Sequence, residues 1–211
     1  MLERIEHQDE AIVSADEVRR YAEAQGRMKF MYRPLAKEIR ALRITGSYLE
    51  VGAGPGLLAA MLAEENPNLR ITAVDLSPEM ANVACQYFRE RQLQDRIDYV
   101  VGDANDGNMI RELGRFDLVY STLSLHHWKE PGKSIRNLWE VVKDSGVLYI
   151  CDLKRVWWLY FLPGADFVRA AYTSGEIEQM LQGSGISNYG IKTLFPFFMQ
   201  SITVSKSRIC S

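Results

Sequence analysis

The fold of this chain is decided by the stretch Tyr48-Leu49-Glu50-Val51-Gly52-Ala53-Gly54-Pro55-Gly56-Leu57-Leu58-Ala59. It begins as a short apolar strand with an acid near its carboxyl end, continues through three alternate glycines, and then reads as a helix. Glycine lets a backbone turn tightly and come close to a ligand, because it carries no Cβ. A strand that ends in this way, with a helix beyond it, forms the ligand crevice at the carboxyl edge of an α/β sheet.

The acid and the glycine spacing narrow the ligand that this turn would bind. A pyrophosphate would be repelled by the Glu50 carboxylate, whereas a ligand with an ammonium and a sulfonium group would be tolerated or favoured. Dinucleotide-binding turns need G-x-G-x-x-G, but the third glycine here is Gly56 and the next residue is Leu57. The turn therefore favours a cationic ligand, and a purely structural role for Glu50 is the alternative.

Size and composition suit one ordinary globular domain. The chain has 211 residues and a formal net charge of -2, which gives no electrostatic reason to expect a nucleic-acid partner. No run approaches the roughly 20 apolar residues of a membrane span. Cys85, Cys151 and Cys210 form no C-x-x-C pair, which argues against a disulfide framework or a zinc site. The start lacks a signal-peptide pattern, so we expect a cytoplasmic protein.

Strands and helices alternate along most of the chain. The pattern predicts strands at 47–51, 70–75, 97–101, 116–121 and 146–152, with helices at 56–65, 78–91, 107–113 and 133–143. This alternation predicts a mostly parallel sheet with right-handed crossovers and helices on both faces. A helix at 174–183 and an antiparallel hairpin of strands at 188–195 and 199–205 would close the fold.

Helical periodicity upstream of this pattern predicts two extra N-terminal helices. Ser14 and Glu17 have the spacing of a capping box for the first, which would run to about Ala24. The second would cover residues 30–42, with Pro34 in its first turn, where a missing amide is tolerated.

Polar residues follow neighbouring strands at the points where a nucleoside would cross the strand ends. Asp75 ends one strand and would accept hydrogen bonds from the two vicinal hydroxyls of a ribose. Asp103 lies in Gly102-Asp103-Ala104, where it would accept from an exocyclic amine while the next backbone amide donates to a ring nitrogen. The alternatives are a helix N-terminal acid for Asp75 and a plain turn residue for Asp103.

Taken in order, these motifs resemble the class I S-adenosylmethionine-dependent methyltransferases, and most of all their type 11 and type 25 small-molecule groups. The resemblance spans residues 46–152. It is carried by the E-x-G-x-G-x-G loop, Asp75, the GDA segment, the FDLV strand followed by LHH, and Val142–Gly146. The family's proline-glycine-glycine turn before the fifth strand is reduced here to Asp144-Ser145-Gly146. The resemblance implies a Rossmann-like sheet of seven strands, with S-adenosyl-L-methionine as cofactor and S-adenosyl-L-homocysteine as product.

The resemblance also implies roles for the matching residues. The methionine part of the cofactor would be held by Glu50 and by the backbone of Gly52, Ala53, Gly54 and Gly56. The nucleoside would be held by Asp75 at the ribose, Leu76 and Met80 beside the adenine, and Asp103 and Ala104 at its edge. Ser121 would close the site near the cofactor's amino group.

Two histidines follow the fourth strand, where a general base would face the methyl group. His126 and His127 are candidates for that base, and packing with loop hydrogen bonding is the alternative. Two histidines without a third ligand at helpful spacing predict no metal site. The run Val156–Pro163 is either a buried connector or a wall over an apolar or aromatic acceptor. The candidate substrate contacts are Tyr32, Trp157, Trp158 and Tyr160.

We therefore expect a single domain over residues 1–211. It would comprise a helical cap at 1–45, a cofactor-binding core at 46–152, and a substrate-side insertion with the closing hairpin at 153–211. The expected function is in-line methyl transfer to a small molecule through oxygen, nitrogen or carbon. No N-P-P-Y-type tetrapeptide follows Ser121, which argues against methylation of nucleobase amines. The alternatives are a non-catalytic S-adenosylmethionine-binding regulatory or assembly protein and, disfavoured by the glycines, an NAD-dependent oxidoreductase.

Overall fold

The computed structural model describes residues 2–5, 20 and 29–206. The predicted capping box of Ser14 and Glu17, and the helix that it would begin, lie outside the described residues.

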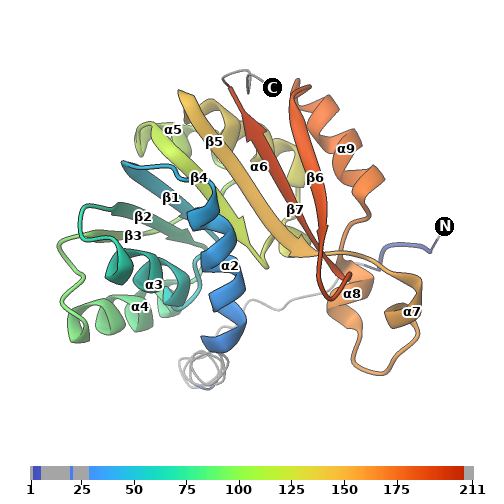
Figure 1. Cartoon of the computed structure of the whole chain (residues 1–211), viewed down its shortest axis with the longest axis horizontal. Coiled ribbons are helices and arrows are strands. Elements are labelled where there is room, and N and C mark those ends of the chain that lie inside the picture. The colour runs from blue at the N-terminus through green and yellow to red at the C-terminus, as the bar shows by residue number, and fades with distance from the viewer. Residues whose placement is uncertain (1, 6–19, 21–28, 207–211) are drawn as a thin grey trace.

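A single sheet of seven strands forms the centre of the molecule (Figure 1). The strands are β1 (Ser47–Val51), β2 (Arg70–Asp75), β3 (Ile97–Val101), β4 (Phe116–Thr122), β5 (Val142–Leu153), β6 (Tyr189–Leu194) and β7 (Met199–Ser205). Their order in the sheet is β3-β2-β1-β4-β5-β7-β6. The first five strands pair in parallel, and β7 pairs antiparallel with both β5 and β6. The predicted parallel sheet with a closing antiparallel hairpin is confirmed.

Helices cover both faces of the sheet, as predicted. One face carries α2 (Lys29–Ala41), α3 (Leu57–Glu65) and α4 (Pro78–Glu90), whose apolar residues share one core cluster. The other face carries α5 (Gly107–Glu112), α6 (Pro131–Glu140) and α9 (Ser174–Gly183), whose residues share a second cluster. Figure 1 shows α2 in front of the sheet and α6 behind it. None of the described helices is long and apolar enough to cross a membrane.

Successive side chains of each strand point to opposite faces of the sheet, which explains why there are two core clusters. In β1, Tyr48 packs into the cluster beneath α2, α3 and α4, whereas the next residue, Leu49, packs into the opposite cluster. In β4, Val119 and Tyr120 divide in the same way. Successive side chains of a strand point to opposite faces, so a sheet buried on both sides needs apolar residues at nearly every position.

The region before β5 differs from the prediction. The helix ends at Glu140 rather than 143, and the strand already begins at Val142 rather than 146. Val142 pairs with Phe116, and after an irregularity the register resumes at Leu118 and Val147. The turn Asp144-Ser145-Gly146 therefore forms a bulge inside the strand. Turn residues hid the pairing of Val142 because bulge and turn share the same composition.

Pro34 also lies elsewhere than predicted. It is the sixth residue of α2, in the interior of the helix as described, and not in the first turn. Its missing amide removes one helical hydrogen bond there.

Strand order creates a switch point at β1, which pairs with β2 on one side and β4 on the other. Chain connections leave in opposite directions at such a point, so a crevice opens at the carboxyl ends of the two central strands. The glycine turn from β1 to α3 lies at this edge.

All three glycines of the turn adopt positive φ angles, of 73°, 52° and 73° at Gly52, Gly54 and Gly56. A Cβ on Gly52 would overlap the Ser124 hydroxyl, and one on Gly56 would overlap the Phe88 ring in α4. A Cβ on Gly54 would meet nothing within 4 Å. The outer glycines thus permit close packing, whereas Gly54 leaves open space in front of the backbone.

Because Gly56 is closely packed and Gly54 is not, substitutions at these two glycines should differ in their effect on stability. Gly54→Ala and Gly56→Ala each place alanine at positive φ, which costs about 1–2 kcal/mol. Gly56→Ala also forces a methyl group into Phe88, and overpacking adds about 1–3 kcal/mol. We expect urea unfolding to show Gly56→Ala as the less stable variant by this second amount. Equal free energies of unfolding would contradict the packing role of Gly56.

Candidate cofactor site at the carboxyl edge of the sheet

The Asp75 carboxylate joins the glycine turn to the next turn of the sheet. The backbone amide of Gly54 donates to its Oδ2 at 2.8 Å, and that of Ser77 donates to its Oδ1 at 3.1 Å. Tyr99 holds the same turn from the other side, because its hydroxyl donates to the Gly54 carbonyl at 2.6 Å. Burial raises the pKa of Asp75, although the two amides oppose that rise. Each carboxylate oxygen keeps lone-pair capacity for a ligand.

A cavity of about 330 Å³ opens beside the Asp75 carboxylate and the glycine turn. Five of the predicted cofactor residues line it, namely Gly52, Asp75, Leu76, Asp103 and Ala104. The remaining lining residues are Val51, Val74, Gly102, Asn105, Ser124, His127, Trp128, Lys129 and Ser134. Residues from the ends of four neighbouring strands therefore meet at the switch point.

The other predicted cofactor residues do not line this cavity. They are Glu50, Ala53, Gly54, Gly56, Met80 and Ser121, none of which is among the residues that line the cavity. Met80 is buried, with 5% of its surface exposed, whereas Leu76 is 66% exposed at the cavity. Of the two residues predicted beside the adenine, only Leu76 presents its side chain to the open space.

Three polar side chains near the switch point have unpaired atoms. The Oε2 atom of Glu50, the Tyr120 hydroxyl and the Oγ atom of Ser121 are buried and have no hydrogen-bond partner among the described residues. Glu50 neighbours Tyr120 across the β1–β4 pair, and Ser121 neighbours Val51. Buried polar atoms are normally paired, so each of these atoms marks a point where a ligand or water completes the bonding.

Burial controls the charge of Glu50. It raises the pKa of this carboxyl to about 8, with a further rise from the nearby Asp75, while Tyr120 and the Ala59 amide oppose the rise. At neutral pH the side chain is mostly protonated in the protein alone. A cation beside it would favour the charged form.

The segment after β3 forms the far wall of the cavity. The Asp103 carboxylate accepts from the Asn105 amide at 2.8 Å, which closes a turn. The Ala104 carbonyl accepts from the buried Asn137 side chain at 2.8 Å, which fixes this turn against α6. The turn role of Asp103, weighed above as an alternative, is present together with its place in the cavity wall.

Ser124 and Trp128 line the cavity without having been predicted from the sequence. The indole of Trp128 donates to the Ser124 hydroxyl at 3.0 Å, and that hydroxyl packs against Gly52. The preceding residue, Leu123, has a positive φ of 55°, an unusual backbone conformation for leucine. Their positions directly before and directly after the LHH run were the one available signal, because neither residue forms a recognisable spacing with another polar group.

The two predicted histidines occupy different environments within the short helix η1 (Leu125–His127). His126 is buried, and its Nδ1 lies 2.7 Å from the Asp152 carboxylate, which also accepts the His126 amide at 2.9 Å. His127 lines the cavity, and its ring centroid lies 3.9 Å from that of His126. The structure therefore brings His127 to the candidate site and places His126 behind it.

The predicted substrate contacts do not line this cavity. Tyr32 lies in α2 and packs, partly buried, against the core cluster of that sheet face. Trp157, Trp158 and Tyr160 lie in α7 (Trp157–Tyr160). The Tyr160 hydroxyl donates to the Glu3 carbonyl at 2.9 Å, and Trp157 and Trp158 are exposed. The run Val156–Pro163 is therefore not a buried connector.

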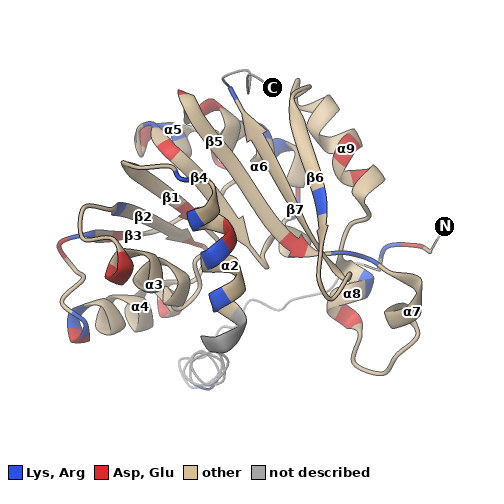
Figure 2. Ribbon diagram, viewed as in Figure 1, with Lys and Arg blue, Asp and Glu red and all other residues tan. Residues whose placement is uncertain are grey.

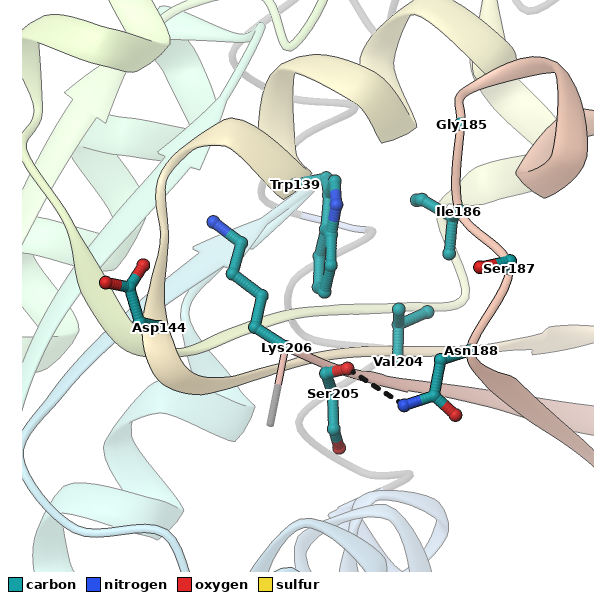
Figure 3. Close-up of a pocket in the computed structure, with 9 residues that line it drawn as sticks. All are labelled: Trp139, Asp144, Gly185, Ile186, Ser187, Asn188, Val204, Ser205 and Lys206. Carbon is teal, nitrogen blue, oxygen red and sulfur yellow. Dashed lines mark hydrogen bonds between the residues drawn. The ribbon is translucent and has the colours of Figure 1, made fainter. Parts of the chain in front are cut away.

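A second hollow, at the opposite edge of the sheet, contains none of the predicted residues (Figure 3). It lies where β7 ends and where the chain enters β6, and Lys206 lies over the Trp139 ring there, 5.1 Å from its centroid. Among residues 2–5, 20 and 29–206, no three histidine, cysteine or acidic side chains are grouped to hold a metal ion.

Comparison with known proteins agrees with the geometry. Residues 49–150 match the type 11 methyltransferase domain family. A ubiquinone biosynthesis O-methyltransferase of Coxiella burnetii is 30% identical over 122 residues, which cover 57% of this chain and 50% of that protein. One from Xanthomonas campestris is 29% identical over 176 residues, with 80% and 72% covered. The chain thus spans about half the length of the Coxiella relative.

Solved structures share the fold. A Methanococcus maripaludis protein, proposed to be an S-adenosyl-L-methionine-dependent methyltransferase, superposes with a TM-score of 0.76 over 96% of this chain and 97% of its own. Its identity of 22% shows the fold alone. The domain match assigns residues 49–150, which contain the glycine turn, to the methyltransferase domain family. The strand order and the superposition show that the chain has the fold of the class I S-adenosylmethionine-dependent methyltransferases.

Proposed function

We propose that this chain binds S-adenosyl-L-methionine at the switch-point cavity and transfers its methyl group to a small-molecule acceptor. One observation carries the proposal: Gly52, Asp75 and Asp103, from three different turns, line a single cavity that His127 also enters. A nucleoside ligand needs contacts of this kind at the carboxyl ends of adjacent strands.

The residues present fit this cofactor in chemistry and in space. The unpaired Oε2 of Glu50 and Oγ of Ser121 are acceptors beneath the turn, suited to the ammonium of the methionine part. The open space in front of Gly54 accommodates close approach of a ligand to the backbone. Asp75, already bonded to two amides, keeps lone pairs for the ribose hydroxyls.

Asp103, Ala104 and Leu76 have the remaining roles in our proposal. Asp103 and the backbone at Ala104 read the edge of the adenine, and Leu76 covers its face. Leu76 exposes 66% of its surface, which leaves it free to pack on a ring. Gly56 and Ala53 act through the shape of the turn, and Met80 supports Leu76 from the buried side.

The bound sulfonium supplies a methyl group that is activated for in-line displacement by a nucleophile. The chain's own contribution is to hold the acceptor in line with that methyl group and to exclude water. We propose a hydroxyl on an aromatic ring as the acceptor. The two ubiquinone O-methyltransferase relatives support oxygen, and the Trp128 indole at the cavity supports an aromatic ring.

His127 is the proposed general base for the acceptor hydroxyl. It lines the cavity, whereas His126 is held behind it by Asp152. The His126 ring contacts that of His127 at an interplanar angle of 43° and so positions it. A positioned base of this kind contributes about 10²–10⁴-fold to the rate of proton transfer chemistry.

Location and partners are proposed on indirect grounds. The described cysteines, Cys85 and Cys151, are both free thiols, which supports a reducing compartment and hence the cytoplasm. The net charge of -2 supports a small molecule, rather than a nucleic acid, as the substrate. The division into a cap at 1–45, a core at 46–152 and a substrate-side part at 153–211 is likewise a proposal.

The ribose role of Asp75 predicts a loss of cofactor affinity. Asp75→Asn removes a charged acceptor, which costs about 1.5–3 kcal/mol, or roughly 10- to 100-fold in the dissociation constant of S-adenosylhomocysteine. Calorimetric titration measures this change. Asp98→Asn, on the exposed face of β3, is the matched control and should bind as the unchanged chain does. Unaltered affinity of Asp75→Asn would exclude the ribose assignment.

The raised pKa of Glu50 predicts proton release on binding. With a pKa of about 8, this carboxyl is protonated at pH 7, and an ammonium placed beside it favours ionisation. We expect release of between about half a proton and one proton at pH 7. Titrations of S-adenosylhomocysteine in buffers of different ionisation enthalpy measure the number. Glu50→Gln should release close to none, and equal release by both proteins would disprove the role.

The sign of the corresponding stability effect follows from the same pKa. Because the folded state holds the Glu50 proton more tightly than the unfolded state, the protein alone should lose stability as pH rises from about 4.5 to about 8. Glu50→Gln should remove this contribution.

The base role of His127 predicts slow turnover with intact cofactor binding. His127→Ala should lower kcat by about 10²–10⁴-fold, while the affinity for S-adenosylhomocysteine changes by less than about threefold. The assay incubates the chain with S-adenosylmethionine and a panel of hydroxylated aromatic compounds. Unchanged kcat would show that the acceptor needs no base. Cofactor binding without methylation of any panel member would favour the non-catalytic alternative.

Tight NAD(H) binding without S-adenosylhomocysteine binding would favour an oxidoreductase instead. The same calorimeter distinguishes these cases, because each ligand is titrated separately into the same preparation.

A further inference from the structure

Large apolar side chains are exposed mainly in two segments of the molecule. Of the ten exposed large hydrophobic residues among those described, seven lie within 157–167 and 195–197. They are Trp157, Trp158, Phe161, Leu162, Phe167, Phe195 and Phe197. We call these seven residues the aromatic edge. Exposed fractions of 73% for Trp157, 72% for Phe161 and 82% for Phe195 mean that these side chains project from the fold.

The two segments lie side by side. The ring of Trp158 packs edge-on against Phe198, with centroids 6.2 Å apart, and the Lys154 amide donates to the Phe198 carbonyl at 2.8 Å. Figure 1 shows α7 and α8 (Asp166–Ala170) beside the turn that joins β6 to β7. The aromatic edge is therefore one continuous region built from two loops.

Charge around these loops has a distinct arrangement. Residues 156–165 and 193–199 contain no charged side chain, and Figure 2 shows α7 without acidic or basic residues. The charged residues that flank them, within 154–170 and 192–199, are Lys154, Arg155, Arg169 and Lys192 against the single acid Asp166. Arg155 is buried with Glu176, and Asp166 pairs with Arg169. Lys192 lies 3.9 Å from the Glu38 carboxylate in an exposed pair, and Lys154 donates to the Thr193 hydroxyl at 3.0 Å. Of the two rim lysines, Lys154 is therefore the one without an acidic partner among the described residues.

A soluble monomer rarely exposes a contiguous apolar region of this kind without a partner for it. Projecting tryptophan and phenylalanine side chains, free of local charge and flanked by lysines, have the composition of an interfacial membrane anchor. Lysines at the rim attract anionic headgroups, while the rings enter the boundary between headgroups and acyl chains. Since no described helix can span a bilayer, contact would be peripheral.

The aromatic edge continues into the candidate site. The Phe167 ring lies edge-on to both histidines, with its centroid 6.0 Å from that of His126 and 6.1 Å from that of His127. His127 lines the cofactor cavity. A bilayer against the aromatic edge would therefore lie beside the catalytic face of the sheet.

We propose that the aromatic edge docks the protein on the surface of a lipid bilayer that carries anionic headgroups. This binding is independent of the proposed methyl transfer, because it needs neither cofactor nor acceptor. Its consequence is that amphiphilic molecules held in the bilayer are presented close to His127.

Vesicle co-sedimentation of the full chain tests the proposal. We expect binding to vesicles of phosphatidylcholine with about 30% phosphatidylglycerol, and weaker binding to phosphatidylcholine alone or at 0.5 M salt. Trp157 and Trp158 supply half of the chain's four tryptophans, so their fluorescence should shift to the blue and be quenched by brominated lipids.

Substitutions locate the contact. Phe161→Ser with Phe195→Ser should weaken binding to the anionic vesicles at least ~10-fold, because two anchoring rings are lost. Val101→Ser, an exposed apolar residue at the end of β3, is the matched control and should bind as the unchanged chain does. Unchanged affinity for S-adenosylhomocysteine in the double variant shows that the fold and the cofactor site are intact.

Three results would overturn the proposal. The first is that the full chain binds neither type of vesicle. The second is that the double variant and the unchanged chain bind equally well. The third is sedimentation velocity showing a dimer that becomes monomeric in the double variant, without vesicle binding by either protein, which would assign the aromatic edge to a second copy of the chain.

Discussion

The Asp75 carboxylate is the interaction on which the candidate site depends. By accepting the amides of Gly54 and Ser77, it joins the turn after β1 to the turn after β2 and sets the distance between them. Gly54 donates its amide to this carboxylate from a backbone conformation with positive φ. A residue with a side chain would be strained in that conformation, which explains the glycine. The same carboxylate faces the cavity, so one residue both builds the crevice and offers it a charged acceptor.

Polar groups at the two central strands add a second constraint. Glu50 and Ser121 lie beneath the switch point with unpaired atoms, and burial keeps Glu50 mostly protonated at neutral pH. On the other side of the turn, Ser124 packs so closely on Gly52 that no side chain fits between them. The loop after β4, which carries Ser124 and His127, is thereby tied to the cofactor turn. Cofactor binding and the placement of the proposed base are parts of one packing arrangement.

Sequence patterns predicted the fold well because the alternation of strands and helices is strong where both sheet faces are buried. They failed at Val142, whose pairing is hidden by a bulge of turn residues, and at Pro34, whose place in α2 depends on where the helix starts. Gly52, Asp75 and Asp103 could be found because parallel strand ends converge. Ser124, Trp128 and the Asp152 partner of His126 could not, because tertiary packing brings them together without a local spacing. The exposed position of α7 also depends on such packing.

A crystal structure of the chain with S-adenosyl-L-homocysteine tests the central claim most directly. The account predicts electron density at the switch point, with the ribose hydroxyls within hydrogen-bond distance of Asp75 and the amino group toward Glu50. The homocysteine sulfur should face the side of the cavity that His127 lines. Density for the ligand in the hollow beside Trp139 and Lys206, or a ribose bonded to residues other than Asp75, would contradict the account.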